Sequence, residues 1–274
     1  MPQPRQPRRP PLPRPPRIPP LRLSPLQPAR SVERAEKTTK SGHAFPPFER
    51  FDVFMRHFDW KQGEHLTIIG PTGSGKTVLA RQLLHRRGYV VVLGVKNRDP
   101  ELYGPFQREG YELVHRFEPE PPEDAQAARV LFVPQTNLHD EEARRFRGKA
   151  FRAVLNEIYD VGDWCVYMDD LQYQVDKLKL ATPLEELWQL GRSEGVTVVG
   201  SSQEPIDIPV MAYGMATHLF LFRNDDLYRA KRMAELAGRN REVVQTTILD
   251  LDHHEFLYLN RATGQMVCSM VTRQ

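Results

Sequence analysis

The sequence predicts an α/β protein with a doubly wound, mostly parallel sheet. From Phe45 onward, apolar runs of strand length alternate with segments of helical spacing, which is the order that parallel strands and crossover helices require. The first apolar run leads through a glycine-rich turn directly into a helical segment. Two later runs, at 164–170 and 196–203, are largely apolar and end in polar residues, which is typical of buried parallel strands with a functional carboxyl edge.

The remaining elements follow from the same periodicity. Strands are expected at 65–70, 89–95, near 112–115, and at 129–133, 164–170, 196–203 and 218–223. Helices are expected at 76–86, 141–159, 183–192 and 226–237. Loops rich in proline and acidic residues are expected between the early strands. A C-terminal β-hairpin is expected at 255–271, turning at Ala262-Thr263-Gly264.

Composition divides the chain into two parts. Residues 1–44 alternate proline with arginine and short apolar residues, so we expect a disordered tail followed by one domain at 45–274. With 274 residues, 40% of them hydrophobic, the chain can bury one substantial core. Residues 1–40 carry ten basic and two acidic side chains, whereas the whole chain has a net charge of only +3. The body is therefore net acidic, which excludes a uniformly basic nucleic-acid binder and makes any DNA contact local.

The tail has several interpretations. Its arginines suit nucleic acid or an acidic partner, and its Pro-x-x-Pro segments suit a protein partner with an aromatic groove. Otherwise it is a solvated extension, or the product of a start codon placed too early. Cys165 and Cys268 have no metal-ligand or disulfide spacing, which favours a reducing cytoplasm. No apolar run approaches the roughly 18 residues of a membrane span, so we expect a soluble protein.

The glycine-rich turn has the pattern of a phosphate-binding loop. Its residues are Gly70, Pro71, Thr72, Gly73, Ser74, Gly75, Lys76 and Thr77. Glycines allow successive backbone N–H groups to point inward, the following helix adds its positive end, and the lysine reaches the outer phosphates. The pattern therefore predicts a site for the phosphates of a ligand, rather than a glycine-rich surface turn. The Thr77 hydroxyl is expected to bind Mg²⁺.

Paired carboxylates end the strand expected at 164–170. A phosphate-binding enzyme needs acids at this edge, because Mg²⁺ must be held there and the attacking water must be polarised there. We assign Asp169 to the metal shell with Thr77, and Asp170 to orienting or deprotonating the water. By itself, such a pair is also typical of a helix N-cap and turn.

Two further residues are candidates for sensing or completing the site. Gln203 ends the next buried strand, where a neutral amide can respond to the γ-phosphate or simply bond within a loop. Arg192 lies on the tight connection before that strand. It either faces solvent or reaches a nucleotide held by a neighbouring subunit, where it would stabilise transition-state charge.

Taken together, four segments resemble the FtsK/HerA group of DNA-translocating P-loop ATPases, which have a RecA-like core. The segments are 70–77, 166–170, Gly191-Arg192-Ser193-Glu194-Gly195 and 198–205. The resemblance implies ATP and Mg²⁺ as cofactors, double-stranded DNA bound without sequence specificity, and a homo-oligomer in the form of a hexameric ring. It also implies that Arg192 acts across the subunit interface and that Gln203 is a sensor.

The chain departs from that family at its second acid, which is usually glutamate and here is Asp170. Glu64 and Glu194 are therefore alternative candidates for the base. The chain also lacks the membrane spans, barrel domain and winged helix of larger members. Such a bare motor domain is similar to the genome-packaging ATPases of some icosahedral viruses, although a plasmid translocase fits as well. The expected location is cytoplasmic or virus-associated.

Two basic segments are candidates for DNA contact. One is the loop expected at 172–181, with Lys177 and Lys179. The other is a cluster on the helix expected at 141–159, which is equally typical of a solvated face: Arg144, Arg145, Arg147, Lys149 and Arg152.

Two other functions fit the same phosphate-binding loop. A P-loop kinase would transfer the γ-phosphate to a small acceptor, although no arginine-rich lid follows the second acid. A nucleotide-dependent assembly factor would change conformation without moving DNA.

Overall fold

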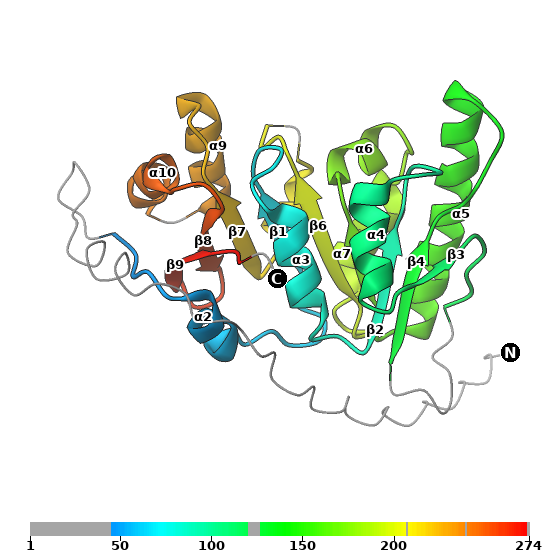
Figure 1. Ribbon diagram of the computed structural model, residues 1–274, viewed down its shortest axis with the longest axis horizontal. Helices are drawn as coiled ribbons and strands as arrows, with labels where there is room; N and C mark the ends of the chain where they lie inside the picture. The colour runs from blue at the N-terminus through cyan, green and yellow to red at the C-terminus, as the bar shows by residue number, and fades with distance from the viewer. Residues whose placement is uncertain (1–44, 120–126, 207, 239, 273–274) are drawn as a thin grey trace, which may run out of the picture.

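The computed structural model describes residues 45–119, 127–206, 208–238 and 240–272 (Figure 1). The tail predicted at 1–44 lies outside the described residues. The strands are β1 (Leu66–Ile69), β2 (Tyr89–Leu93), β3 (Glu112–Val114), β4 (Ala128–Phe132), β5 (Cys165–Met168), β6 (Thr197–Ser202), β7 (His218–Phe222), β8 (Glu255–Asn260) and β9 (Met266–Met270). The helices are α2 (Phe51–His57), α3 (Lys76–Leu84), α4 (Pro100–Arg108), α5 (Asp140–Val161), α6 (Leu171–Asp176), α7 (Ala181–Leu190), α8 (Val210–Gly214), α9 (Leu227–Ala237) and α10 (Arg241–Asp250).

Within these described residues, the strands form one mixed sheet in the order β3-β4-β2-β5-β6-β1-β7-β8-β9. The pairings from β3 through β7 are parallel, and the last two strands pair antiparallel. β1 lies between β6 and β7, and β5 pairs with β6, so the segments that follow β1, β5 and β6 share the carboxyl edge of the sheet. The predicted fold class is confirmed.

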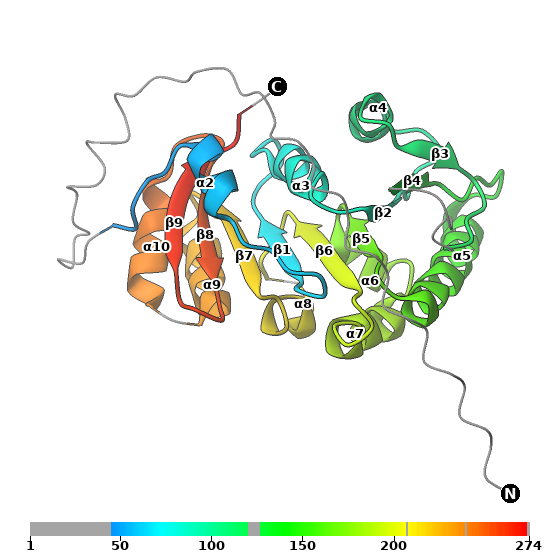
Figure 2. The ribbon, with the colours of Figure 1, turned by 90° about the horizontal axis from the view of Figure 1, so that it is seen from below.

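Helices cover both faces of the sheet (Figure 2). On one face α2, α3 and α4 enclose a core that includes Leu83 and Phe106. On the other face α5 through α10 enclose a second core, which includes Phe151, Trp188 and Met233. Because β1, β5 and β6 are buried along their whole length, the position of their ends is fixed by the cores on both faces.

Five α-helices of the described chain were not expected from the sequence: α2, α4, α6, α8 and α10. In α4, Asp99 accepts a hydrogen bond from the Leu102 N–H at 3.1 Å, and Pro100 occupies the first turn, where its missing N–H costs little. Pro105 inside α4 is typical of a loop, and the packing of the helix overrides it.

The segment expected as a lysine-bearing loop at 172–181 is partly helical. α6 takes its first five residues, and only the stretch around Lys177 and Lys179 connects α6 to α7. Leu171 is fully buried against the sheet, and this burial stabilises a helix that the sequence pattern did not predict.

The C-terminal hairpin is confirmed. β8 and β9 join through residues 261–265, and the Asn260 side-chain carbonyl accepts hydrogen bonds from the Ala262 and Thr263 amides. Across the described ranges, no helix combines the length and the apolar character needed to cross a bilayer.

Candidate functional site

The phosphate-binding loop connects β1 to α3, as predicted. Gly73 and Gly75 have φ of +78° and +109°, a region that disfavours residues with a Cβ. A Cβ at Gly70 would lie 2.5 Å from the Phe222 Cβ and 2.8 Å from the Ser74 Oγ, so glycine is required there by close approach. Because α3 begins at Lys76, its first N–H groups have no partner within the helix and are available to an anion.

The Lys76 side chain is held within this loop. Its ammonium group donates to the carbonyls of Gly70 at 2.8 Å and Pro71 at 2.9 Å, and only 8% of the residue is exposed. Burial lowers the pKa of Lys76, whereas the nearby carboxylates of Asp169 and Asp170 act in the opposite direction. The arrangement brings a buried cation and both predicted acids to the same edge.

The two predicted Mg²⁺ ligands lie together. The Thr77 hydroxyl is 3.5 Å from Oδ1 of Asp169. The same oxygen accepts hydrogen bonds from the Tyr167 hydroxyl at 2.9 Å and from the Ser201 hydroxyl at 2.7 Å. Burial raises the pKa of Tyr167 well above its usual range, so this hydroxyl keeps its proton and remains a donor. An alcohol beside a carboxylate is a donor set that suits Mg²⁺.

Tyr167 and Ser201 are residues that sequence reasoning missed. Tyr167 is two residues before Asp169, on the same face of the strand. Met168 pairs with Gly200, so Ser201 lies level with Asp169 on the neighbouring strand. The signal was therefore present in the register of two parallel strands, although it could be found only once β5 and β6 were known to be neighbours.

Asp170 has a structural role as well as its predicted chemical one. It adopts φ of +63°, and its Oδ1 accepts a hydrogen bond from the Tyr173 N–H at 3.3 Å, which caps α6. The alternative interpretation of the acid pair, a helix N-cap, is thus correct for Asp170. A non-glycine residue at positive φ is uncommon, and such residues concentrate at functional sites.

Gln203 follows β6 and lies over the phosphate-binding loop. Its side-chain carbonyl accepts a hydrogen bond from the Thr72 hydroxyl at 2.8 Å. The polar end of β6 and the tip of the loop are therefore in direct contact, as a sensor of the phosphate would require.

Arg192 lies at the opposite edge of the sheet. It occupies the turn between α7 and the start of β6, whereas Gln203 follows the end of that strand. The six residues of β6, at about 3.3 Å each, separate the two edges by roughly 15–20 Å. Arg192 is exposed, and its backbone packs on Gly63, which precedes β1. Arg192 therefore does not reach the phosphate-binding loop of its own chain.

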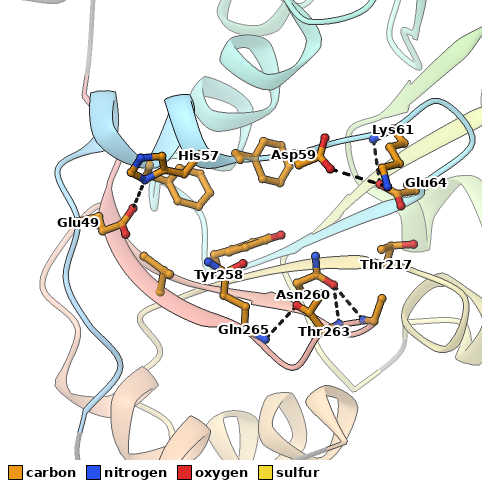
Figure 3. Close-up of a pocket in the computed structure, with 14 residues that line it drawn as sticks. Glu49, His57, Asp59, Lys61, Glu64, Thr217, Tyr258, Asn260, Thr263 and Gln265 are labelled. Atoms are coloured by element: carbon orange, nitrogen blue, oxygen red, sulfur yellow. Dashed lines mark hydrogen bonds and ion pairs between the residues drawn. The ribbon is translucent and has the colours of Figure 1, made fainter.

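Glu64 and Glu194, the alternative bases, also lie at that far edge, so this expectation is wrong for a site within one chain. Glu64 precedes β1, where it accepts a hydrogen bond from the Lys61 N–H at 2.9 Å and pairs with His218 at 3.1 Å. Glu64 lines a cavity of about 250 Å³. Figure 3 shows its side chain there with those of Tyr258 and Asn260. Glu194 lies in the turn before β6. Both carboxylates are separated from Lys76 by the length of a strand.

The two basic segments proposed for DNA contact are neighbours in the fold. The Arg152 guanidinium donates to the Lys179 carbonyl at 2.6 Å. A Cβ at Gly148 would lie 2.5 Å from the Leu178 carbonyl oxygen, so α5 and the α6–α7 connection touch at this glycine. The side chains of Lys149, Arg152, Lys177 and Lys179 are all exposed. We call these four residues the basic surface.

Comparison with solved structures finds relatives in fold, whereas comparison of sequences finds none. No protein-family model matches the sequence, and neither does any curated protein. The genome-packaging NTPase B204 of Sulfolobus turreted icosahedral virus 2, in complex with AMP, superposes with a TM-score of 0.56 at 13% identity, over 78% of this chain and 100% of B204. The chain has the fold of this packaging NTPase.

A second structure, VirB4 of Thermoanaerobacter pseudethanolicus, gives the same TM-score of 0.56 at 10% identity, over 77% of this chain and 89% of VirB4. B204 has also been solved in complex with ATP-γ-S, where the TM-score is 0.56 at 14% identity. At the level of the fold, the predicted resemblance to FtsK/HerA-type P-loop ATPases is confirmed.

Proposed function

We propose that this chain is an ATP hydrolase whose turnover moves double-stranded DNA through a ring of identical subunits. One observation carries the proposal: Lys76, Thr77, Asp169, Asp170 and Gln203 converge on one edge of the sheet, while Arg192 is exposed on the other. The first edge would hold a nucleotide, and the second exposes an arginine that would reach a nucleotide held by another subunit.

The residues fit ATP with Mg²⁺. The loop amides and the Lys76 ammonium would hold the phosphates, and Thr77 and Asp169 would hold the ion. Bound there, Mg²⁺ would neutralise charge on the phosphate oxygens. Asp170 would orient the attacking water, and Gln203 would respond to the γ-phosphate through Thr72.

The position of Arg192 supports the proposed ring. Arg192 is exposed, and nearby Leu190 is 51% exposed. An apolar residue and a cation are thus exposed together at this edge of the sheet. In a head-to-tail ring, this edge would face the phosphate-binding loop of the next subunit. Arg192 would then stabilise the charge that develops during hydrolysis in the neighbour.

The basic surface is the proposed DNA contact. Four exposed cations on α5 and the α6–α7 connection suit phosphates, and none of them offers a pattern for reading bases. α6 joins this surface to Asp170, which caps the helix. B204 is described as a DNA-packaging ATPase, and its fold supports the same kind of work for this chain.

The first experiment is steady-state ATP hydrolysis by the purified chain, with and without long double-stranded DNA, using Lys76→Ala as the blank. DNA should stimulate turnover, and added salt should reduce the stimulation because phosphate contacts release counterions. The Lys177→Ala/Lys179→Ala variant should keep basal turnover and lose the stimulation. Turnover that is indifferent to DNA would favour the assembly factor, and phosphate transfer to a small acceptor would favour the kinase.

A mixing experiment tests the ring. Lys76→Ala subunits keep Arg192 but do not hydrolyse ATP, and Arg192→Ala subunits keep a complete phosphate-binding loop. Each variant alone should be inactive, whereas a mixture should regain activity, because the first supplies Arg192 to the second. An Arg192→Ala monomer with normal turnover would refute the role in a neighbouring site.

A further inference from the structure

The C-terminal hairpin reaches the phosphate-binding loop because of its topology. β8 pairs antiparallel to β7, and β7 pairs parallel to β1. The start of β8 therefore lies at the carboxyl edge, beside the loop that follows β1. The turn immediately before β8 contains His253 and His254, and the second of these has φ of +67°.

His254 contacts the loop directly. Its Nδ1 lies 3.0 Å from the carbonyl oxygen of Ser74, the second residue before Lys76. A carbonyl only accepts, so Nδ1 carries the hydrogen of this bond. His254 is itself held in place, since its own carbonyl accepts a hydrogen bond from the Val271 N–H at 3.0 Å.

The hairpin also encloses the next residue of the loop. A Cβ at Gly75 would lie 3.4 Å from the His254 Nδ1 and 3.8 Å from the Val271 Cβ. Beyond β9, the Thr272 carbonyl accepts a hydrogen bond from the Gln82 side chain on α3 at 2.9 Å. The hairpin is thus joined both to the loop and to the helix that the loop begins.

The contact between His254 and the Ser74 carbonyl fixes the direction of the Gly75 N–H. The Ser74 carbonyl and the Gly75 N–H belong to one planar trans peptide unit, in which they point in opposite directions. Holding the carbonyl toward His254 therefore holds the Gly75 N–H away from the hairpin. Gly75 has φ of +109°, so its backbone has the freedom of glycine and needs an external restraint.

We propose that His254 is a positioning residue for nucleotide binding: it orients the Ser74–Gly75 peptide, and the C-terminal hairpin supports the phosphate-binding loop through it. The inference rests on the proposed binding of ATP to this loop. It gives the hairpin a role in affinity for the phosphates, in addition to covering the sheet edge.

The test compares two substitutions that both tolerate positive φ. His254→Gly removes the ring without backbone strain, whereas His254→Asn places an amide N–H near the position of Nδ1. His57→Ala is the matched control, because this exposed histidine lines the cavity with Glu64 at the far edge of the sheet. The readouts are the Kd of ATP-γ-S with Mg²⁺, the KM and kcat for ATP, and the thermal unfolding midpoint.

Loss of one such hydrogen bond should weaken binding of ATP-γ-S by about fivefold in His254→Gly, with the larger effect on KM. His254→Asn should recover most of the affinity, and His57→Ala should match the wild type. If His254→Gly binds ATP-γ-S as tightly as His57→Ala does, or if His254→Asn fails to recover affinity at an unchanged unfolding midpoint, the inference is wrong. A wild-type chain that binds no nucleotide would instead overturn the proposed function.

Discussion

Gly63→Ala should move Arg192 and slow ATP hydrolysis while the chain remains folded. A Cβ at Gly63 would lie 2.9 Å from the Arg192 carbonyl oxygen and 3.2 Å from its Cα and Cγ. Because real Cβ atoms essentially never approach within 3.0 Å of another atom, the turn that carries Arg192 must move. The substitution therefore displaces the arginine without changing its charge or its side chain.

Two costs can be worked out for this variant. Gly63 has φ of +81°, where alanine costs roughly 1–2 kcal/mol of stability. The displacement of Arg192 should be a few tenths of an ångström. Since a misplacement of about 1 Å can cost about 100-fold in rate, we expect kcat to fall roughly tenfold. Binding of the nucleotide should be unchanged, because the phosphate-binding loop lies at the other edge.

Gly110→Ala is the matched control. Gly110 has φ of +85°, and a Cβ there would meet nothing within 4 Å, so this variant has the backbone cost without the clash. Both variants should lose stability in denaturant titration because of the positive φ, and Gly63→Ala should lose more because its turn must also move. Only Gly63→Ala should lose ATP hydrolysis at unchanged affinity for ATP-γ-S. Equal turnover in the two variants would refute the argument that the position of Arg192 limits hydrolysis.

Two other predictions follow from the buried ionisable groups and from the cap of α6. Burial lowers the pKa of His65 to about 4, compared with 6.5 in the unfolded chain, so the unfolded state binds the proton more readily. The free energy of unfolding should therefore decline as the pH falls from about 6.5 to 4, by about 3 kcal/mol from this group. Denaturant titrations across this range should show the decline. His65→Leu should show a smaller slope, with the remainder coming from His218, whose pKa burial also lowers. Asp170→Asn should keep the cap of α6 and the unfolding midpoint, because asparagine caps helices as well as aspartate, yet its kcat should fall about 100-fold. Asp170→Ala should lose both the cap and the activity. Full activity in Asp170→Asn would exclude Asp170 as the group that orients water.

The sequence alone predicts the parts of the fold that depend on the local pattern of residues. The runs that became β1, β5 and β6 are largely apolar, and each leads directly into residues of the site. The parallel order then requires those ends to meet at one edge. It also requires Arg192, which precedes β6, to lie at the other edge, so the separation of Arg192 from Lys76 follows from the order of the residues along the chain.

The parts that were missed depend on packing between distant segments. α10 contains several β-branched residues, which weaken a helical pattern, and it forms because Val244 and Ile248 are buried against the second core. The contact of His254 with Ser74 joins residues 180 positions apart. No local signal marks it, because it exists only once the antiparallel pairing of β8 with β7 has brought the start of the hairpin to the phosphate edge.

The two roles of Asp170 suggest why a shorter acid suits this chain. The residue must end β5 and begin α6, and aspartate is a strong N-cap and tolerates the positive φ found here, whereas glutamate does neither well. The carboxylate proposed to direct water is thus the group that fixes the start of α6. A helix of six residues spans about 9 Å and ends beside Lys177, so the acid and the basic surface are joined by one short rigid element. Any displacement of Asp170 during turnover would move the proposed DNA contact of the same subunit, while in the proposed ring Arg192 would connect that subunit to the next.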